Sequence, residues 1–337
     1  MRSKRRFRLS GDRTHDWTQT LSTKRSLALA VEAAATPGSY GTAPNGFRLP
    51  ERTRLGEVTL RVSNLERSLD FYATLLGFRL LEQSATRAVL GAVGDARALI
   101  VLQEVPGVAP VPTVGRLGLF HVAIVVPTRG DLGRLVQQLA AHGVALGAGD
   151  HLVSEAFYLQ DPDGLGLELY RDRPRAEWRR VNRELMMATD PVDVAGVVAA
   201  GAGSDWAGMP AGTTIGHVHL RVGTLEGAAA FFSDAMGFDL MVWSYPGALF
   251  FGAGGYHHHV GTNIWGAAGA SPARADEAAL VEWTIELHDA DGMTAAAALD
   301  AVAESLRSGG FAAARDASGA VVTQDPWGTA VRLRRVD

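Results

Sequence analysis

The 337-residue sequence contains no cysteine. This absence excludes disulfide bonds, thiolate-bound zinc or iron–sulfur sites, and a cysteine nucleophile. Any bound metal must therefore be held by histidine, aspartate or glutamate. The sequence also lacks an uninterrupted apolar run of the ~20 residues that a membrane-spanning helix needs. We therefore expect a soluble, cytoplasmic protein without a membrane partner.

Charge is also sparse. Only 20% of the residues are charged, and the formal net charge is -4. A chain without a positive excess has no general attraction to a polyanion, so we expect no nucleic-acid partner. Hydrophobic residues make up 47% of the chain, which is typical of a globular protein. The length is sufficient for two domains.

Residues 1–50 differ in composition from the rest of the chain. They include the basic stretch KRRFR and the alanine-rich stretch SLALAVEAAATPGS. An export signal is one interpretation, but Glu32 interrupts its short apolar region. We favour a flexible extension, or a start codon placed too early, and exclude residues 1–50 from the fold.

An internal repeat begins after Leu55. The segment LRVSNLERSLDFYATLLGF starts at Leu60, and LRVGTLEGAAAFFSDAMGF starts 160 residues later at Leu220. Each copy predicts a strand, a turn and an amphipathic helix that ends at a glycine, where a left-handed backbone costs least. The chain therefore contains two related halves.

A second match lies later in each half. FYLQDPDGLGLELYRDRP resembles VVTQDPWGTAVRLRRV, and a turn of the form DPxG joins two predicted strands in both. Together the matches predict an α+β protein of four βαβββ modules, which start near residues 55, 117, 214 and 280. We assign residues 51–175 to one pair of modules, 176–213 to a linker packed on the surface, and 214–337 to the other pair.

This pattern resembles the vicinal oxygen chelate superfamily, in which two such modules curl their sheets into a cup around a metal. Within it, GDHLVSEAFYLQDPDGLGLELYRDRPRAEW and GGYHHHVGTNIW are most similar to ring-cleaving extradiol dioxygenases of the catechol 2,3-dioxygenase kind. The resemblance covers about residues 55–337. It implies four modules paired into two cup-shaped mixed sheets.

The resemblance also implies that metal ligands lie on the first and last strands of a module. These positions hold His121 and Glu168 in the second module and His217 in the third. The fourth module ends with Arg332 instead, and a guanidinium stays protonated and cannot ligate a cation. Pairing of the second module with the third would assemble two histidines and one carboxylate, the set that holds Fe(II) in non-haem oxygenases.

Pairing of the first module with the fourth would then form a second, metal-free cup with a structural role. The alternative is the conventional pairing of the first module with the second, which would leave His217 without its carboxylate. A single histidine on an apolar strand is usually a buried core residue rather than a ligand. The metal prediction therefore depends on the three residues occurring together at repeat-equivalent positions.

A run of three histidines supplies candidates for proton transfer. His257, His258 and His259 lie in the strand-like segment GGYHHHVGTN, and alternation of faces on a strand would point His258 away from its neighbours. By resemblance to the family, His258 is the acid/base. A register slip of one residue would transfer this role to His257 or His259, and a solvated histidine run is the structural alternative.

Two more residues resemble substrate-positioning groups of the family. Tyr158 lies ten residues before Glu168, the spacing at which extradiol enzymes carry a tyrosine that hydrogen-bonds the substrate. His151 resembles their other active-site histidine. We expect both to orient the substrate and the reaction intermediates, although a core tyrosine and a solvent-exposed loop histidine are the structural alternatives.

Three further side chains are weaker candidates. His219 lies two residues beyond the predicted ligand His217 on the same strand face, so it could line the cup or compete as a ligand. Asn263 and Trp265 could shape the pocket.

These observations predict an Fe(II)-dependent extradiol dioxygenase that cleaves catechol or a substituted catechol with O2, with Mn(II) as an alternative metal. Its partners would be a small aromatic diol and O2, and related proteins often form homo-oligomers. One rival is a glyoxalase-like metal-dependent isomerase or lyase, which usually has a fourth protein ligand that we do not find. The other is a metal-free small-molecule-binding protein of the bleomycin-resistance type.

Overall fold

The computed structural model describes residues 32–290 and 292–336. Most of the extension that we expected to be flexible, residues 1–31, lies outside this part of the chain. Residues 32–50 differ from that expectation, because β1 (Glu32–Ala34) pairs with β10 (Arg179–Val181) and the side chains of Tyr40 and Leu49 are buried. Apolar residues at these positions have a core in which to pack.

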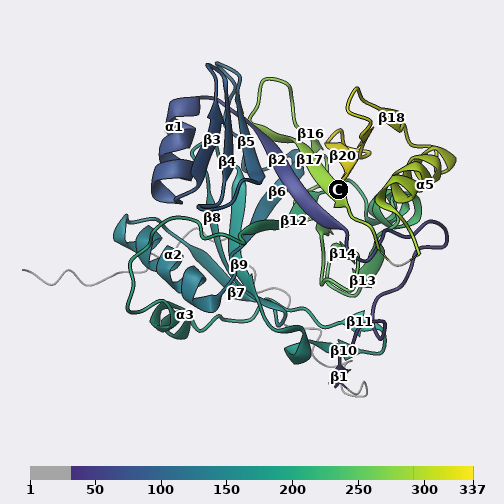
Figure 1. Ribbon diagram of the computed structural model, residues 1–337, viewed down its shortest axis with the longest axis horizontal. Helices are drawn as coiled ribbons and strands as arrows, with labels where there is room; N and C mark the ends of the chain where they lie inside the picture. Colours follow the sequence, from purple (N-terminus) through teal and green to yellow (C-terminus); the bar gives the residue numbers. More distant parts are fainter. Residues whose placement is uncertain (1–31, 291, 337) are drawn as a thin grey trace, which may run out of the picture. The chain divides into compact units, whose positions relative to one another are not determined.

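The first half of the chain contains two modules of a strand, a helix and three strands (Figure 1). The first module comprises β2 (Arg54–Val62), α1 (Leu65–Leu69), the π-helical turn η2 (Asp70–Leu75), β3 (Arg79–Gln83), β4 (Arg87–Gly91) and β5 (Ala98–Glu104). The second comprises β6 (Arg116–Val125), α2 (Arg129–Ala141), β7 (Gly147–Asp150), β8 (Ser154–Gln160) and β9 (Gly166–Asp172).

The second half repeats this order. The third module comprises β12 (Thr214–Arg221), α4 (Leu225–Ala228), the π-helical turn η4 (Ala229–Ala235), β13 (Asp239–Val242), β14 (Ala248–Gly252) and β15 (Val260–Asn263). The short strand β16 (Ser271–Pro272) follows, and the fourth module comprises β17 (Ala279–Leu287), α5 (Ala295–Ser308), β18 (Ala314–Arg315), β19 (Val321–Gln324) and β20 (Ala330–Arg335). The predicted four-module fold is therefore confirmed.

Local sequence explains where the helices begin and end. Asn64 caps α1 by accepting a hydrogen bond from the backbone N–H of Arg67, and Thr128 forms a capping box with Asp131 at the start of α2. The two repeat-equivalent helices are followed by glycines at φ 81° and 95°, at positions 77 and 237. Glycine adopts this left-handed conformation without strain.

The sheet order shows which modules combine. One sheet has the order β13-β14-β15-β12-β6-β9-β8-β7 and joins the third module to the second through antiparallel β12 and β6. The other has the order β18-β19-β20-β17-β2-β5-β4-β3 and joins the fourth module to the first through antiparallel β17 and β2. The pairing of inner with inner and outer with outer modules is therefore confirmed, and the conventional alternative is wrong.

A common hydrophobic core connects the two sheets. It contains side chains from all four modules, including Val58, Val122, Val218 and Trp283, each of which is fully buried. Because such interiors are closely packed, the sheet that carries β6, β9 and β12 has a rigid support.

The segment between the second and third modules is more than a surface linker. It contains η3 (Arg175–Glu177), β10, β11 (Glu184–Leu185) and α3 (Val194–Ala200). Trp178 is only 1% exposed, and the Asp193 side chain caps α3 by accepting a hydrogen bond from the backbone N–H of Gly196. No helix in the described part of the chain is long and apolar enough to cross a membrane.

Candidate metal centre

The three predicted ligands lie on adjacent strands of the inner-module sheet. Strand β6 pairs with β9 on one side and with β12 on the other, so that Ala123 lies opposite both Glu168 and His217. His121 is two residues from Ala123 on β6 and therefore faces the same side. The small Ala123 side chain leaves the space between the ligands open.

The donor atoms of this triad converge. The Nε2 atom of His121 lies 2.9 Å from Oε2 of Glu168, and Nε2 of His217 lies 3.3 Å from the same oxygen. The two Nε2 atoms are 3.4 Å apart. All three side chains are buried, with exposures of 6% for His121 and 2% for each of the others.

These separations fit a shared first-row metal ion. Donors about 2.1 Å from one ion, at right angles to each other, are separated by about 3.0 Å. Burial lowers the pKa of His217 to about 4. Burial alone would raise the pKa of Glu168, but the adjacent His217 and His121 outweigh it and hold that pKa well below its usual range. At neutral pH the carboxylate is ionised and His217 is neutral, as metal ligation requires.

Tyrosines pack behind the triad. The hydroxyls of Tyr170 and Tyr256 lie 2.7 Å apart, and the Tyr170 ring centroid is 5.2 Å from that of His217. A Cβ atom at Gly216 would lie only 1.7 Å from the Tyr170 hydroxyl oxygen. Glycine next to His217 therefore permits this close approach, which sequence reasoning did not detect.

Tyr158 and His151 lie together beside the triad. Tyr158 is opposite Glu168 in the β8–β9 ladder, and its ring centroid is 5.5 Å from that of His121. Nδ1 of His151 donates to the carbonyl of Ala188 at 2.6 Å, so Nε2 can accept from the Tyr158 hydroxyl, with which it forms a short contact. Burial, reinforced by Glu168, raises the pKa of Tyr158 well above its usual value, which keeps the hydroxyl protonated.

The histidine run is a loop between β14 and β15 and not a strand. Strict alternation of faces therefore does not apply, and the expectation that His258 points away from His257 is wrong, because their Nδ1 atoms lie 2.7 Å apart. The ring of His258 packs on that of His217 with centroids 4.0 Å apart. Nδ1 of His259 instead accepts from the backbone N–H of Ala253 at 3.2 Å.

Two groups near the triad were only partly anticipated. His219 lies opposite His121 in the β6–β12 ladder, but it accepts a 2.9 Å hydrogen bond from Asn263 and does not belong to the cluster of converging donors. Asp172, at the end of β9, lies 2.8 Å from Nε2 of His257. Period-two alternation from Glu168 through Tyr170 places Asp172 on the ligand face, and this signal was available in the sequence.

The corresponding positions in the outer-module sheet form ion pairs. Arg332 contacts Glu282 at 2.9 Å and also contacts Asp316. Arg334 contacts Glu57 and Glu286, both at 2.7 Å. Guanidinium groups at these positions are themselves cations and cannot ligate a metal ion.

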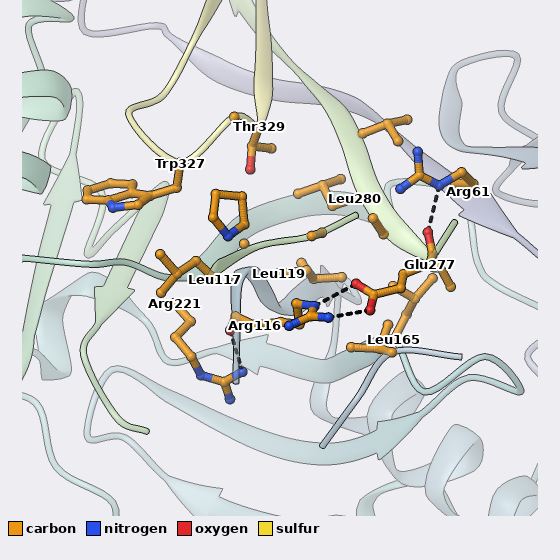
Figure 2. Close-up of a pocket in the computed structure, with 18 of the residues that line it drawn as sticks. Arg61, Arg116, Leu117, Leu119, Leu165, Arg221, Glu277, Leu280, Trp327 and Thr329 are labelled. Atoms are coloured by element: carbon orange, nitrogen blue, oxygen red, sulfur yellow. Dashed lines mark hydrogen bonds and ion pairs between the residues drawn. The ribbon is translucent and has the colours of Figure 1, made fainter. Parts of the chain in front are cut away.

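A separate cavity of about 290 Å³ lies away from the triad (Figure 2). Figure 2 shows Arg116 and Glu277 paired along its wall, below Trp327 and Leu280. None of the three predicted ligands lines this cavity.

Comparison with known proteins agrees with this architecture. Residues 54–169 match the model of the glyoxalase/bleomycin resistance protein/dioxygenase superfamily. A catechol-2,3-dioxygenase from Bacillus subtilis (strain 168) is 42% identical over 265 residues, which are 77% of this chain and 90% of the relative. The chain therefore belongs to this superfamily.

Solved structures show the same fold at lower sequence identity. A provisionally named dioxygenase from Bacillus subtilis subsp. subtilis strain 168 is 17% identical, with a TM-score of 0.57 and coverage of 86% of both chains. A glyoxalase I variant from Zea mays is 18% identical, with a TM-score of 0.50 and coverage of 84% of this chain and 94% of its own. These two likenesses concern the fold alone.

Proposed function

We propose that this protein is an Fe(II)-dependent extradiol dioxygenase that cleaves catechol or a substituted catechol with O2. The observation that carries the proposal is the convergence of His121, Glu168 and His217 on one buried point. The 42% identical relative named catechol-2,3-dioxygenase supports the same reaction. When bound, Fe(II) would supply the redox-active centre that lets O2 react with an aromatic diol.

The protein residues around this point would bind, orient and exchange protons with the substrate. The Tyr158 hydroxyl donates its proton to His151, so its oxygen is an acceptor suited to a hydroxyl of the substrate. His258 packs on the ring of His217, which is a suitable position for an acid/base that accepts a proton from the diol and later returns it. Burial excludes bulk water and strengthens these interactions.

The donor set favours this function over a glyoxalase-like isomerase. Such an enzyme usually holds its metal with a fourth protein ligand, and within the described residues the cluster contains three donors. An open coordination site is what a substrate diol and O2 require.

The test is oxygen consumption by the full-length protein after anaerobic loading with Fe(II). We expect equimolar loss of catechol and O2 and a yellow ring-fission product. His217→Ala should retain the fold, measured by circular dichroism, but bind no iron. A wild-type protein that binds one iron and consumes no O2 with catechol or its substituted forms would overturn the proposal, and Mn(II) loading would distinguish between the two metals.

A further inference from the structure

A line of three polar side chains leads away from the triad. The ring of His258 packs on that of His217 with centroids 4.0 Å apart. Nδ1 of His258 lies 2.7 Å from Nδ1 of His257, and Nε2 of His257 lies 2.8 Å from Oδ1 of Asp172. The line therefore connects Nδ1 of the candidate acid/base, through His257, to a carboxylate that lies 85 residues before His257 in the sequence.

Hydrogen-bond chemistry fixes the protons along this line. A carboxylate oxygen can only accept, so Nε2 of His257 carries a proton and donates it to Asp172. Nδ1 of neutral His257 is then an acceptor, and Nδ1 of His258 must be the donor. Nε2 of His258, on the opposite edge of the ring, is left with a free lone pair. It has no hydrogen-bond partner among the described residues.

The surroundings hold this arrangement in place. His257 is fully buried and lies between Tyr256, at a ring-centroid distance of 4.1 Å, and Trp178, at 5.4 Å. The Asp172 side chain is 31% exposed. Together with Arg175 and Tyr256 it lines a second cavity, also of about 290 Å³, which is not the one drawn in Figure 2. The imidazole of His257 thus has a fixed plane, a fixed acceptor and no room to rotate.

We propose that Asp172 and His257 are positioning residues that fix His258 in the tautomer with Nδ1 protonated, so that Nε2 is the atom available to accept the substrate's proton. This proposal rests on the proposed function for its consequence in catalysis. The tautomer itself follows from the contacts of Asp172, His257 and His258 with His257 neutral. Free neutral histidine prefers the proton on Nε2, so without this line His258 would present a donor where an acceptor is needed.

Histidine tautomers give the direct test. The full-length protein, labelled with ¹⁵N-histidine, would be observed by NMR as purified and again after loading with diamagnetic Zn(II). We expect His258, assigned by its loss in His258→Gln, to show a protonated Nδ1 and an unprotonated Nε2. Asp172→Asn should shift His258 toward the other tautomer, and Asp276→Asn, which changes an exposed pair with Arg274, should not. A wild-type His258 protonated on Nε2 would overturn the proposal.

Kinetics then test whether the two residues act through His258. Asp172→Asn should lower kcat about 10- to 100-fold, within the range that an acid/base contributes, with the KM for catechol and the iron content nearly unchanged. In a His258→Gln background the same substitution should have no further effect, because its partner is already lost. An equal loss in both backgrounds would show a merely structural role and overturn the proposal.

The two proposals fail in different ways. A wild-type protein without dioxygenase activity would remove the proposed function but leave the tautomer measurement intact. An active wild-type enzyme with unchanged kcat in Asp172→Asn would remove the positioning role alone.

Discussion

Replacement of Glu168 by glutamine should weaken metal binding while preserving the shape of the side chain. Oε2 of Glu168 is the atom nearest to both histidine donors, at 2.9 Å from His121 and 3.3 Å from His217. Loss of a residue that merely supports a ligand costs about 10- to 100-fold in affinity, so removal of the anionic ligand itself should cost at least about 100-fold. Glu168→Gln leaves the two imidazoles in place and isolates the effect of the charge.

Weaker metal binding should appear as a smaller increase in Tm when Mn(II) is added. At a Mn(II) concentration of about 100 times the wild-type Kd, metal binding stabilises the wild-type protein by about 2.7 kcal/mol, whereas a variant with 100-fold weaker binding gains about 0.4 kcal/mol. The difference corresponds to about 3 °C in Tm for a chain of this length. Scanning calorimetry over a Mn(II) titration measures the metal-dependent increment for each variant.

A second buried glutamate provides the control. Glu155 is 2% exposed and pairs with Arg129 at 2.8 Å and Arg171 at 2.6 Å. Glu155→Gln should lower the starting Tm, because it weakens buried ion pairs, but should keep the full metal-dependent increment. A full increment in Glu168→Gln would refute the assignment of this carboxylate as a ligand.

Three further predictions concern the surroundings of the site and the fold. Gly216→Ala should destabilise the protein by about 1–3 kcal/mol, because its Cβ would lie 1.7 Å from the Tyr170 hydroxyl oxygen. Tyr170→Phe should partly restore stability in the Gly216→Ala background. Gly46→Ala, where a Cβ meets nothing within 4 Å, should leave the free energy of unfolding in urea unchanged. Burial raises the pKa of Asp325 to about 6, so the folded state binds more protons than the unfolded state between about pH 4 and 6, and stability falls as pH rises through this range. Asp325→Asn should remove this loss, so that its free energy of unfolding relative to wild type rises by about 1–3 kcal/mol between pH 4 and 7. A difference between the two proteins that does not change with pH would contradict the attribution to the Asp325 carboxyl. Tyr158→Phe should lower kcat about 10-fold or more without loss of metal, and an unchanged kcat at saturating catechol and O2 would exclude Tyr158 from the reaction.

The repeat made the fold predictable because each half of the chain gives the same local signals. The strand, helix and turn sequences recur with a fixed offset, and Arg332 at a ligand position indicated which modules must combine to form a metal site. The sheet order confirms this pairing through β6 and β12. Composition alone would not have identified it.

Contacts between distant segments could not be predicted in the same way. The histidine run resembled a strand, but it forms a loop in which His257 and His258 face each other. Tyr40 and Leu49 looked like part of an extension because no local pattern shows that they pack against other segments. Oδ2 of Asp161 accepts a hydrogen bond from the Tyr72 hydroxyl at 3.0 Å. Oδ2 of the repeat counterpart Asp325 has no such partner, because the residue equivalent to Tyr72 is a phenylalanine.

The most direct test of the metal centre is a crystal structure of the anaerobic, metal-loaded protein with anomalous scattering recorded at the absorption edge of the metal. We expect one peak within about 2.0–2.2 Å of Nε2 of His121, an oxygen of Glu168 and Nε2 of His217. A fully loaded protein whose metal lies elsewhere, with these three side chains bonded only to one another, would contradict the assignment.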